Sequence, residues 1–406
     1  MTNSNIFDKV AVQMMTTNSE TPKLKKIVFP FVEAGLGHIM PMRAVADAFE
    51  AKYGDKCIVE RTFFFQEENN PDLKYIEEML IKEVYKHNRN KIHGLYQSFL
   101  MNFLGSQKSI RWLYSWWWKR GYLPSMTRMQ EFDADLIFHT HFATLFYGCE
   151  SKYQGKTKAK NVLYCPDPII GNQWDKRVDF ATLSSNLGEK KARKKRGFKK
   201  FSTRFATVPF LIRSQIAEYT NSRIEYKKQL GIEPSKFTIL LADGAYGVGK
   251  LKQTVYELLK SPMPLTIIPV CGKNEALYRE FISITPPSHI ELKPYGFTDQ
   301  MLLLASSCDL FIGKAGASNL AEPTYFGVPS IVTFTATAIE KWICAHYTKV
   351  LGCTKKITNI KKAVKLAISF AENPSLMKPL IDATIPARRH DGPEQLADIL
   401  WEELNA

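Results

Sequence analysis

Hydrophobic runs of strand length alternate with amphipathic stretches of helical length along most of the chain, starting at Lys25. This alternation is typical of a doubly wound parallel sheet, in which a helix follows each strand and packs on the sheet. The pattern occurs twice. The expected strands cover residues 25–31, 57–63, 135–141 and 161–165 in the first series, and 237–242, 265–270, 289–295, 309–314 and 329–334 in the second.

Two such series predict an α/β protein with two Rossmann-like domains that face one another across a cleft, and 406 residues are enough for both. We expect a basic linker and a long helical stretch between them, at about 185–230. Ligands of such sheets bind outside the carboxyl ends of the strands. The expected parts are a loose tail over residues 1–24, a first domain over 25–206, a second domain over 207–385, and a C-terminal helix over 386–406 that packs back on the first domain.

Charge and cysteine content narrow the expected partners and location. The formal net charge of +15 predicts an anionic partner: nucleic acid, an acidic membrane surface or a substrate that carries phosphate. The seven cysteines have no paired spacing, which favours reduced thiols in a cytoplasmic protein over disulfides or a zinc site. We also expect no signal peptide and no spanning helix, because no apolar run is long enough.

The stretch LLADGAYGVGKL, residues 240–251, comes close to a phosphate-binding P-loop. Leu251 stands where a Ser or Thr would bind magnesium, and no later strand ends in an Asp suited to the second metal-binding motif. A nucleoside triphosphatase is therefore disfavoured. The glycines still predict a turn from strand to helix whose N–H groups would receive a diphosphate.

A second turn of small residues, Gly316, Ala317 and Ser318, follows another expected strand. It leaves room and N–H donors for phosphate. Glu322 lies within two helical turns of it, where a carboxylate would accept hydrogen bonds from ribose hydroxyls. The same residues would also suit an ordinary helix cap.

The sequence GLGH, residues 35–38, follows the first expected strand. Met40 takes the place of the third glycine of a dinucleotide fingerprint, so that fingerprint fails. What remains is a turn that presents His38 at the start of a helix. The imidazole would act there as a general base, or it would only cap the helix or pack at the turn.

Taken in order, these stretches resemble the monogalactosyldiacylglycerol synthases and the processive diacylglycerol glucosyltransferases, which are inverting, UDP-sugar-dependent enzymes of the GT-B fold. The segment GHIMPMRAVADAF also resembles the peptidoglycan lipid-intermediate transferases. The matching stretches are residues 35–49, 167–179, 206–210, 240–251, 269–277, 295–301 and 313–332.

The resemblance implies a role for each domain. The first would bind the acceptor, with Gly37 and His38 in the glycine-rich turn, and with Asp167, seven residues before Trp174, as a rival base. The second would bind the UDP-sugar, which is a substrate, so the scheme needs no cofactor and no metal. Its implied residues are Gly244, Gly247 and Gly249 at the diphosphate, Phe297 at the uracil, Gly316, Ala317, Ser318 and Asn319 with Glu322 around phosphate and ribose, and Glu340 at the donor sugar.

Two residues depart from the family pattern, and one acidic motif is considered separately as a metal site. Ile339 replaces the usual glutamine before the sugar-binding acid, which leaves the donor sugar open. Gly171 replaces a histidine near Trp174, which leaves the details of acceptor activation open. The sequence Asp-Ala-Asp at 133–135 precedes its strand and so lies away from the cleft, which predicts a solvated loop rather than a metal site.

Two segments are candidates for contact with a membrane. Residues 95–122 combine apolar residues, including Trp116, Trp117 and Trp118, with basic ones, which suits the headgroup region of an anionic bilayer. The alternative is a helix packed in the core. Residues 190–204, which include Lys194, Lys195 and Arg196, hold nine basic residues and no acidic one. The alternative there is a solvated linker; nucleic acid is disfavoured because no known binding module accompanies the charge.

The sequence thus predicts a cytoplasmic enzyme, peripheral on a membrane, that moves a hexose from UDP to a lipid such as diacylglycerol or glycosyl-diacylglycerol. One alternative is a transferase for a polyprenyl-linked or soluble natural-product acceptor. Another is a basic adaptor for membranes or nucleic acid that has lost its chemistry. The sugar, the acceptor and the oligomeric state stay open.

Overall fold

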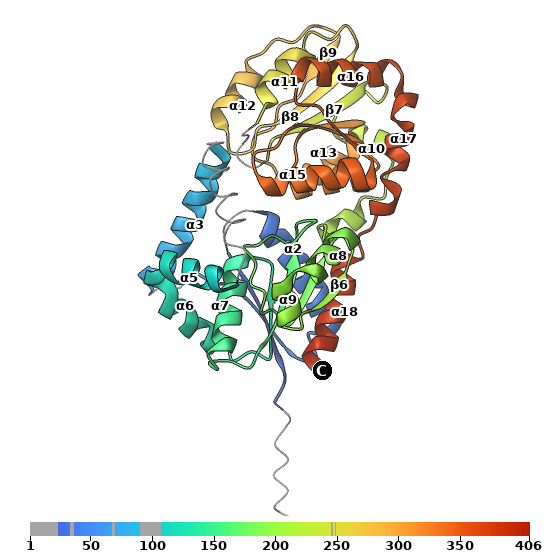
Figure 1. Cartoon of the computed structure of the whole chain (residues 1–406). Helices are drawn as coiled ribbons and strands as arrows, with labels where there is room; N and C mark the ends of the chain where they lie inside the picture. The colour runs from blue at the N-terminus through green and yellow to red at the C-terminus, as the bar shows by residue number, and fades with distance from the viewer. Residues whose placement is uncertain (1–22, 33–35, 67–69, 90–106, 245–246, 248) are drawn as a thin grey trace, which may run out of the picture.

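The computed structural model describes residues 23–32, 36–66, 70–89, 107–244, 247 and 249–406. These residues form two α/β domains stacked one above the other (Figure 1). Each domain contains a six-stranded sheet in which every paired strand is parallel to its neighbour. The prediction of two doubly wound parallel sheets is confirmed.

The sheet of the first domain has the strand order β2-β1-β3-β4-β5-β6. Alternate residues of its strands enter different cores, because successive side chains of a strand point to opposite faces. Ile27 and Phe29 pack with α2, whereas Val28 packs with the helices on the other face. The strands are β1 (Lys26–Phe31), β2 (Ile58–Phe63), β3 (Leu136–His139), β4 (Lys160–Cys165), β5 (Phe180–Leu183) and β6 (Arg204–Thr207).

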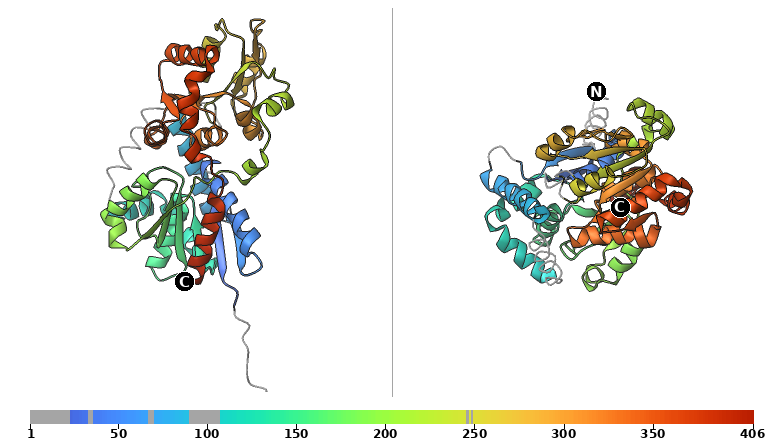
Figure 2. Two further views of the ribbon diagram at one scale, coloured as in Figure 1. Left: turned by 90° about the vertical axis from the view of Figure 1, so that its right-hand side faces the viewer. Right: turned by 90° about the horizontal axis from the view of Figure 1, so that it is seen from above.

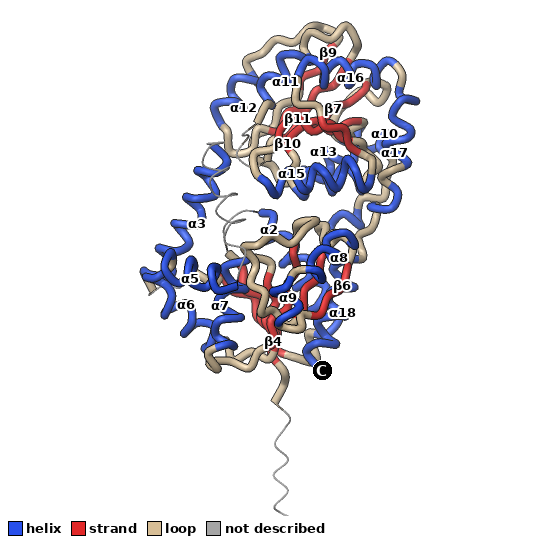
Figure 3. The backbone as a smooth tube through the Cα atoms, viewed as in Figure 1, coloured by secondary structure: helices blue, strands red, loops and turns tan. Residues whose placement is uncertain are grey.

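The sheet of the second domain has the strand order β12-β11-β10-β7-β8-β9. Its two central strands are buried along their whole length, as expected for a parallel sheet that helices cover on both faces (Figure 3). The strands are β7 (Phe237–Ala242), β8 (Leu265–Val270), β9 (Ile290–Leu292), β10 (Leu310–Lys314), β11 (Ser330–Phe334) and β12 (Thr354–Lys356).

Helices connect the strands in both domains. The first domain holds α2 (Leu36–Tyr53), α3 (Pro71–Arg89), α5 (Gln107–Trp117), α6 (Lys119–Glu131), α7 (Phe142–Tyr153), α8 (Asn186–Lys194) and α9 (Arg196–Lys200). The second holds α10 (Arg223–Gln229), α11 (Leu251–Leu258), α12 (Glu275–Ile282), α13 (Met301–Ser307), α14 (Ala317–Tyr325), α15 (Ala338–Ala345), α16 (Ile360–Glu372) and α17 (Lys378–Asp382). Short helical turns η1 (Ser214–Glu218), η2 (His346–Leu351), η3 (Pro374–Met377) and η4 (Ile385–Ala387) complete the connections, and η2 is π-helical.

The last helix, α18 (Gly392–Asn405), returns to the first domain and lies along α2 (Figure 2). Its apolar side chains Leu396, Leu400 and Leu404 are buried against Phe29 and Phe49. The chain therefore crosses between the domains twice, once after β6 and once before α18.

The expected strands correspond to nine of the strands, but three others were not expected. The prediction of a basic linker and a long helical stretch at about 185–230 is wrong. This part of the chain contains β6, which pairs with β5 at the edge of the first sheet. β5, β6 and β12 are only three or four residues long, which is too short for a periodic hydrophobic pattern.

The tryptophans of α5 and its C-terminal end have three different environments. Trp118 is 1% exposed and packs on Tyr114, so the prediction that it meets a membrane is wrong. Trp117 packs partly against the same core. Trp116 is 66% exposed and stacks on Trp112, which is 64% exposed one helical turn earlier. The exposed aromatic pair of α5 is therefore Trp112 and Trp116. Residues 95–106 of the predicted membrane segment lie outside the described residues.

The basic segment at 190–204 forms α8, α9 and the start of β6. Lys194 and Arg196 are exposed. Lys195 is not part of that exposed surface, because its ammonium donates hydrogen bonds to the Ile170 carbonyl at 2.6 Å and to Asn172 at 3.2 Å. Among the described helices, none is both long and apolar enough to span a membrane.

Candidate functional site

The order of the strands reverses at one point in each sheet, between β1 and β3 in the first and between β7 and β10 in the second. At such a point the helices that follow the two strands lie on opposite faces of the sheet, which leaves a crevice for a ligand at the carboxyl ends. The turns singled out in the sequence follow β1, β7 and β10. They therefore lie at the two switch points of the fold.

His38 lies in the first turn of α2, at the switch point of the first domain, next to the exposed Gly37. Its Nδ1 is 2.6 Å from the carbonyl oxygen of Thr140, which follows β3. A carbonyl only accepts hydrogen bonds, so Nδ1 carries the proton and Nε2 of the neutral ring is free to accept one. Burial lowers the pKa of His38, which favours this neutral form. The contact with Thr140 therefore fixes both the tautomer and one end of the ring.

Two aromatic rings pack around His38. Its ring meets the edge of His141 at 4.9 Å, and Trp174 lies 6.5 Å away. Trp174 is 1% exposed and also contacts Phe142 edge-on. Trp174 therefore packs beside His38 in the interior and does not offer an open face to an acceptor.

Asp167 lies two residues beyond β4 and is buried. Burial disfavours the carboxylate and raises the pKa of Asp167 to about 7. A carboxyl group with this pKa exchanges its proton near neutral pH, which is the property required of a general base. His38 and Asp167 thus both suit that role on physical grounds.

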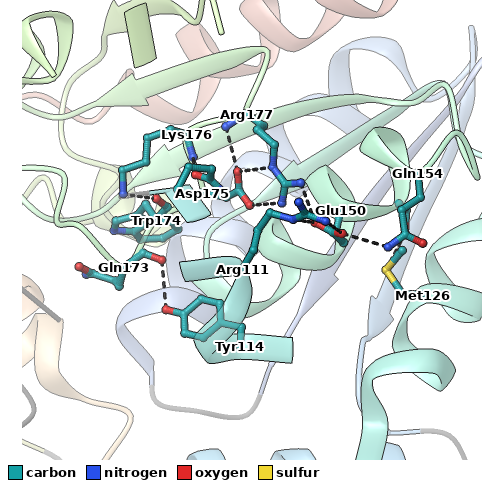
Figure 4. Close-up of polar contacts among 12 residues, drawn as sticks. Arg111, Tyr114, Met126, Glu150, Gln154, Gln173, Trp174, Asp175, Lys176 and Arg177 are labelled. Carbon is teal, nitrogen blue, oxygen red and sulfur yellow. Dashed lines mark hydrogen bonds and ion pairs between the residues drawn. The ribbon is translucent and has the colours of Figure 1, made fainter. Parts of the chain in front are cut away.

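A buried ion-pair cluster fixes the loop that carries Asp167 and Trp174 (Figure 4). Arg177 donates to Asp175 at 2.6 Å and to Glu150 of α7 at 2.6 Å. Glu150 also accepts two bonds from Arg111 of α5, at 2.7 and 2.8 Å. Burial alone would raise the pKa of Glu150, but its hydrogen bonds to Arg111 and Gln154 and the charge of Arg177 lower it to about 2.

Two backbone contacts tie the same loop directly to α5. Tyr114 donates its hydroxyl to the carbonyl of Gln173 at 3.1 Å, and the N–H of Lys176 donates to the side chain of Gln107 at 2.8 Å. The helix that exposes Trp112 and Trp116 is therefore bonded to the loop of the base candidates.

The turn after β7 has a structural need for its glycines. Gly244 and Gly247 adopt φ values of +81° and +59°, which glycine tolerates best. A Cβ on Gly249 would lie 2.2 Å from the carboxylate of Asp243. That carboxylate accepts a hydrogen bond at 2.7 Å from the N–H of Leu251, the first residue of α11. Residues 245, 246 and 248 lie outside the described residues.

The turn after β10 leads into α14 through Gly316. Because glycine has no side chain, no side-chain hydrogen bond caps the start of this helix. The N–H groups of Ala317, Ser318 and Asn319 in the first helical turn have no partner within the helix and are suited to an anion. Glu322, one turn further, is buried and receives two hydrogen bonds from Arg213, at 2.9 and 2.7 Å. Both end on Oε1.

Two more candidate residues, Glu340 and Phe297, belong to the second domain. Glu340, in the first turn of α15, accepts a hydrogen bond from the N–H of Ala336, which precedes the helix. It also forms a 2.7 Å ion pair with Lys314 at the end of β10. Phe297 is 60% exposed, and the ammonium of Lys273 lies 5.6 Å from its ring. An exposed ring of this kind is available for stacking on a flat ligand.

A cleft of about 420 Å³ separates the two domains. On the side of the first domain, Pro166, Pro168 and the residues that follow β5 and β6 line it; on the other side α14, α15 and η2 do. The cleft therefore adjoins both the chain neighbours of Asp167 and the start of α14.

Arg213, Lys314 and Asp243 contact candidate residues but were not expected from the sequence. Lys314 and Asp243 each stand at or next to the end of a central strand, which is a usable signal. Arg213 has no such signal in the sequence. It belongs to the connection between the domains, and only folding brings it next to Glu322. Within the described residues, no group of three His, Cys, Asp or Glu side chains is arranged to hold a metal ion.

Comparison with known proteins agrees with this geometry. Residues 239–340 match the model of the glycosyltransferase family 28 C-terminal domain. A probable chloroplastic monogalactosyldiacylglycerol synthase of Nicotiana tabacum is 23% identical over 77% of this chain and 58% of its own length. A processive diacylglycerol beta-glucosyltransferase of Bacillus pumilus is 35% identical over 31% of this chain and 32% of its own length. The matches thus span about a third to three fifths of these relatives.

Solved structures show the same two-domain fold. MurG of Acinetobacter baumannii has a TM-score of 0.56 at 14% identity and covers 93% of this chain and 99% of its own. Anabaena Alr3699/HepE, solved in complex with UDP-glucose, has a TM-score of 0.53 at 13% identity and covers 93% of this chain and 99% of its own. The predicted GT-B architecture and the resemblance stated from the sequence are confirmed.

The buried carboxyl of Asp167 makes a prediction about stability. Its folded pKa of about 7 lies above the usual value of 3.8, so the folded state holds the proton more tightly, and stability falls as pH rises from about 4 to 7. Asp167→Asn removes this loss. We expect the variant to unfold in urea with a free energy higher than that of the parent by up to about 4 kcal/mol at pH 8, and equal to it near pH 4. An equal difference at both pH values would show that folding does not shift the pKa of Asp167.

Proposed function

We propose that this protein transfers a hexose from a UDP-sugar to a hydroxyl group of a membrane lipid, either diacylglycerol or a glycosyl-diacylglycerol. The observation that carries the proposal is the match of residues 239–340 to a glycosyltransferase C-terminal domain, because this range contains both glycine turns and Glu322. The UDP-glucose complex of a protein with the same fold supports the donor class. The named activities of the two relatives support the lipid acceptor.

In the proposed donor site, the N–H groups at the start of α14 and in the turn after β7 bind the diphosphate. Phe297 stacks on the uracil. Glu322 accepts hydrogen bonds from the ribose hydroxyls. Arg213 holds this carboxylate in place with two hydrogen bonds and offsets part of the rise in its pKa that burial causes. Glu340, held by Lys314, faces the donor sugar.

The proposed reaction inverts the anomeric carbon. A base removes the proton of the acceptor hydroxyl, whose oxygen attacks the anomeric carbon as the bond to UDP breaks. The diphosphate leaves with the added negative charge, which the N–H groups and the dipole of α14 stabilise. His38 is the proposed base, because its Nε2 is free to accept a proton while Thr140 fixes Nδ1.

For membrane contact we propose two exposed features of the first domain. Trp112 and Trp116 on α5 enter the headgroup region, and the basic residues of α8 and α9 attract anionic lipids. Association with the cytoplasmic face of a membrane is part of this proposal. The alternative acceptor is a polyprenyl-linked or soluble molecule, which the shared fold of MurG keeps open.

The overall proposal is tested by incubating the protein with a panel of UDP-sugars and extracted membrane lipids and identifying the product by mass. Formation of a hexosylated glycerolipid is the expected result. Transfer only to a polyprenyl-linked or soluble acceptor would replace the lipid acceptor and retain the donor site. Absence of any sugar transfer or UDP release would favour the adaptor.

The donor site predicts opposite results for two buried carboxylates. Glu322→Ala should weaken UDP binding by roughly 1–3 kcal/mol in calorimetry, because the ribose hydroxyls lose a charged acceptor. Glu340→Ala is the matched control: it should leave UDP affinity unchanged and alter the preference among UDP-sugars. Equal UDP affinity in the Glu322 variant would remove this residue from the site.

The identity of the base is testable from the pH dependence of kcat/KM. With His38 as base, the rate should rise with pH through an inflection below 6.5, because burial lowers its pKa, and His38→Ala should reduce turnover by roughly 10²- to 10⁴-fold. With Asp167 as base, the inflection would lie near 7. An inflection at that pH, absent from Asp167→Asn, would reverse the roles.

Membrane contact is testable by co-sedimentation with anionic vesicles. The double variant Trp112→Ser/Trp116→Ser should lose the part of binding that survives 1 M salt, since apolar burial is not screened. Lys190→Gln/Lys191→Gln/Lys194→Gln should lose the salt-sensitive part. The exposed lysines of α16 provide the control, and Lys361→Gln/Lys362→Gln/Lys365→Gln should bind like the parent. Binding that falls equally in the control would reduce the effect to net charge.

A further inference from the structure

We propose that the cleft between the domains is the binding site for an aliphatic chain of the acceptor lipid. This inference rests on the proposed lipid acceptor and adds to it the place where the chain lies. The cleft has a volume of about 420 Å³, which is within the range of small-molecule sites.

Both sides of the cleft contribute apolar side chains, beside polar lining residues such as Ser184, Thr207 and Gln395. The connection after β6 contributes Phe210 and Ile212, and α15 and η2 contribute Ile343, Tyr347 and Leu351. Ile343, Tyr347 and Ile212 are buried, so they belong to the packed walls rather than to the outer surface. An aliphatic chain between these walls would lose its contact with water on both sides. This burial of apolar surface is the main source of affinity for such a ligand.

Two exposed aliphatic residues lie at the surface of the cleft, one from each domain. Leu187 at the start of α8 is 41% exposed, and Val350 of η2 is 51% exposed. Single exposed side chains of this kind are common, but here they flank the same cleft from opposite domains. They form an apolar mouth through which a chain passes from a bilayer.

The charge beside this mouth favours a lipid over an apolar peptide as the occupant. α8 begins next to Leu187 and exposes Lys190, Lys191 and Lys194, and Lys349 is exposed beside Val350. Each of these basic groups attracts the protein to the surface of an anionic bilayer. Basic groups around an apolar opening match the arrangement of anionic headgroups over hydrocarbon.

Polar groups inside the cleft suit the glycerol end of a lipid. Pro166 and Pro168, on either side of Asp167 in the chain, line the cleft, as does Ala317 in the turn before Glu322. Nδ1 of His346, another lining residue, is buried and has no hydrogen-bond partner among the described residues. A neutral imidazole there would donate a hydrogen bond to an ester carbonyl, in the same cleft as the chain neighbours of Asp167 and the start of α14.

The test is photo-crosslinking of the full chain, which does not depend on turnover. The probe is a diacylglycerol that carries a diazirine at the end of one acyl chain, presented in mixed micelles, and mass spectrometry of peptides locates the label. We expect label in residues 343–351 and 207–212. Label confined to other parts of the chain, with lipid still glycosylated, would overturn this inference and leave the proposed function intact. Transfer to soluble acceptors alone, with no label anywhere, would overturn both.

Two variants test the cleft by affinity. Ala387→Trp fills it and Val350→Glu places a charge at its mouth, so each should raise the KM for dioctanoylglycerol by roughly tenfold, the effect of excluding about two methylene groups. The UDP Kd should not change. Leu376→Glu is the matched control, because Leu376 is also 51% exposed but does not line the cleft, and it should behave like the parent. An unchanged KM in both cleft variants would overturn the inference.

Discussion

The parallel arrangement of both sheets is the constraint on which the rest of the molecule depends. In a parallel sheet all strands end at the same edge, so each turn from strand to helix opens on one side of its domain. The N–H groups at the start of the following helices then point to that side as well. The residues that carry His38 and Asp167 in one domain and the glycine turns in the other all follow such strand ends, and the cleft between the domains is lined by the chain neighbours of Asp167 and by the start of α14.

A different kind of constraint holds the acceptor side of this space. Asp175, Arg177, Glu150 and Arg111 form a cluster in which three of the four side chains are almost completely buried. Burying charged groups costs free energy, and hydrophobic residues packed in the same place would not incur this cost. The cluster is therefore better explained by the loop geometry that it fixes than by a gain in stability. Here it fixes the loop from Asp167 to Asp179 relative to α5 and α7, and with it the surroundings of both base candidates.

The fold could be predicted from the sequence because mostly apolar strands alternate clearly with helices, as around β7 and β8, which are buried along their whole length. The short strands β5 and β6 leave no such pattern, because four residues are too few to show one. The glycine turns could be placed at strand ends, but the reason for Gly249 depends on a contact with Asp243 that only the fold creates. The three tryptophans at 116–118 look alike in sequence, and the helix that carries them decides that one faces solvent and another the core.

The two passages of chain between the domains lie against one another. A Cβ on Gly392, at the start of α18, would come within 2.6 Å of the carbonyl oxygen of Pro209, which follows β6. The domains are thus joined by a double connection at one edge of the cleft, and not by a single flexible tether. A double connection of this kind favours hinge motion about the line of contact, which would change the width of the cleft.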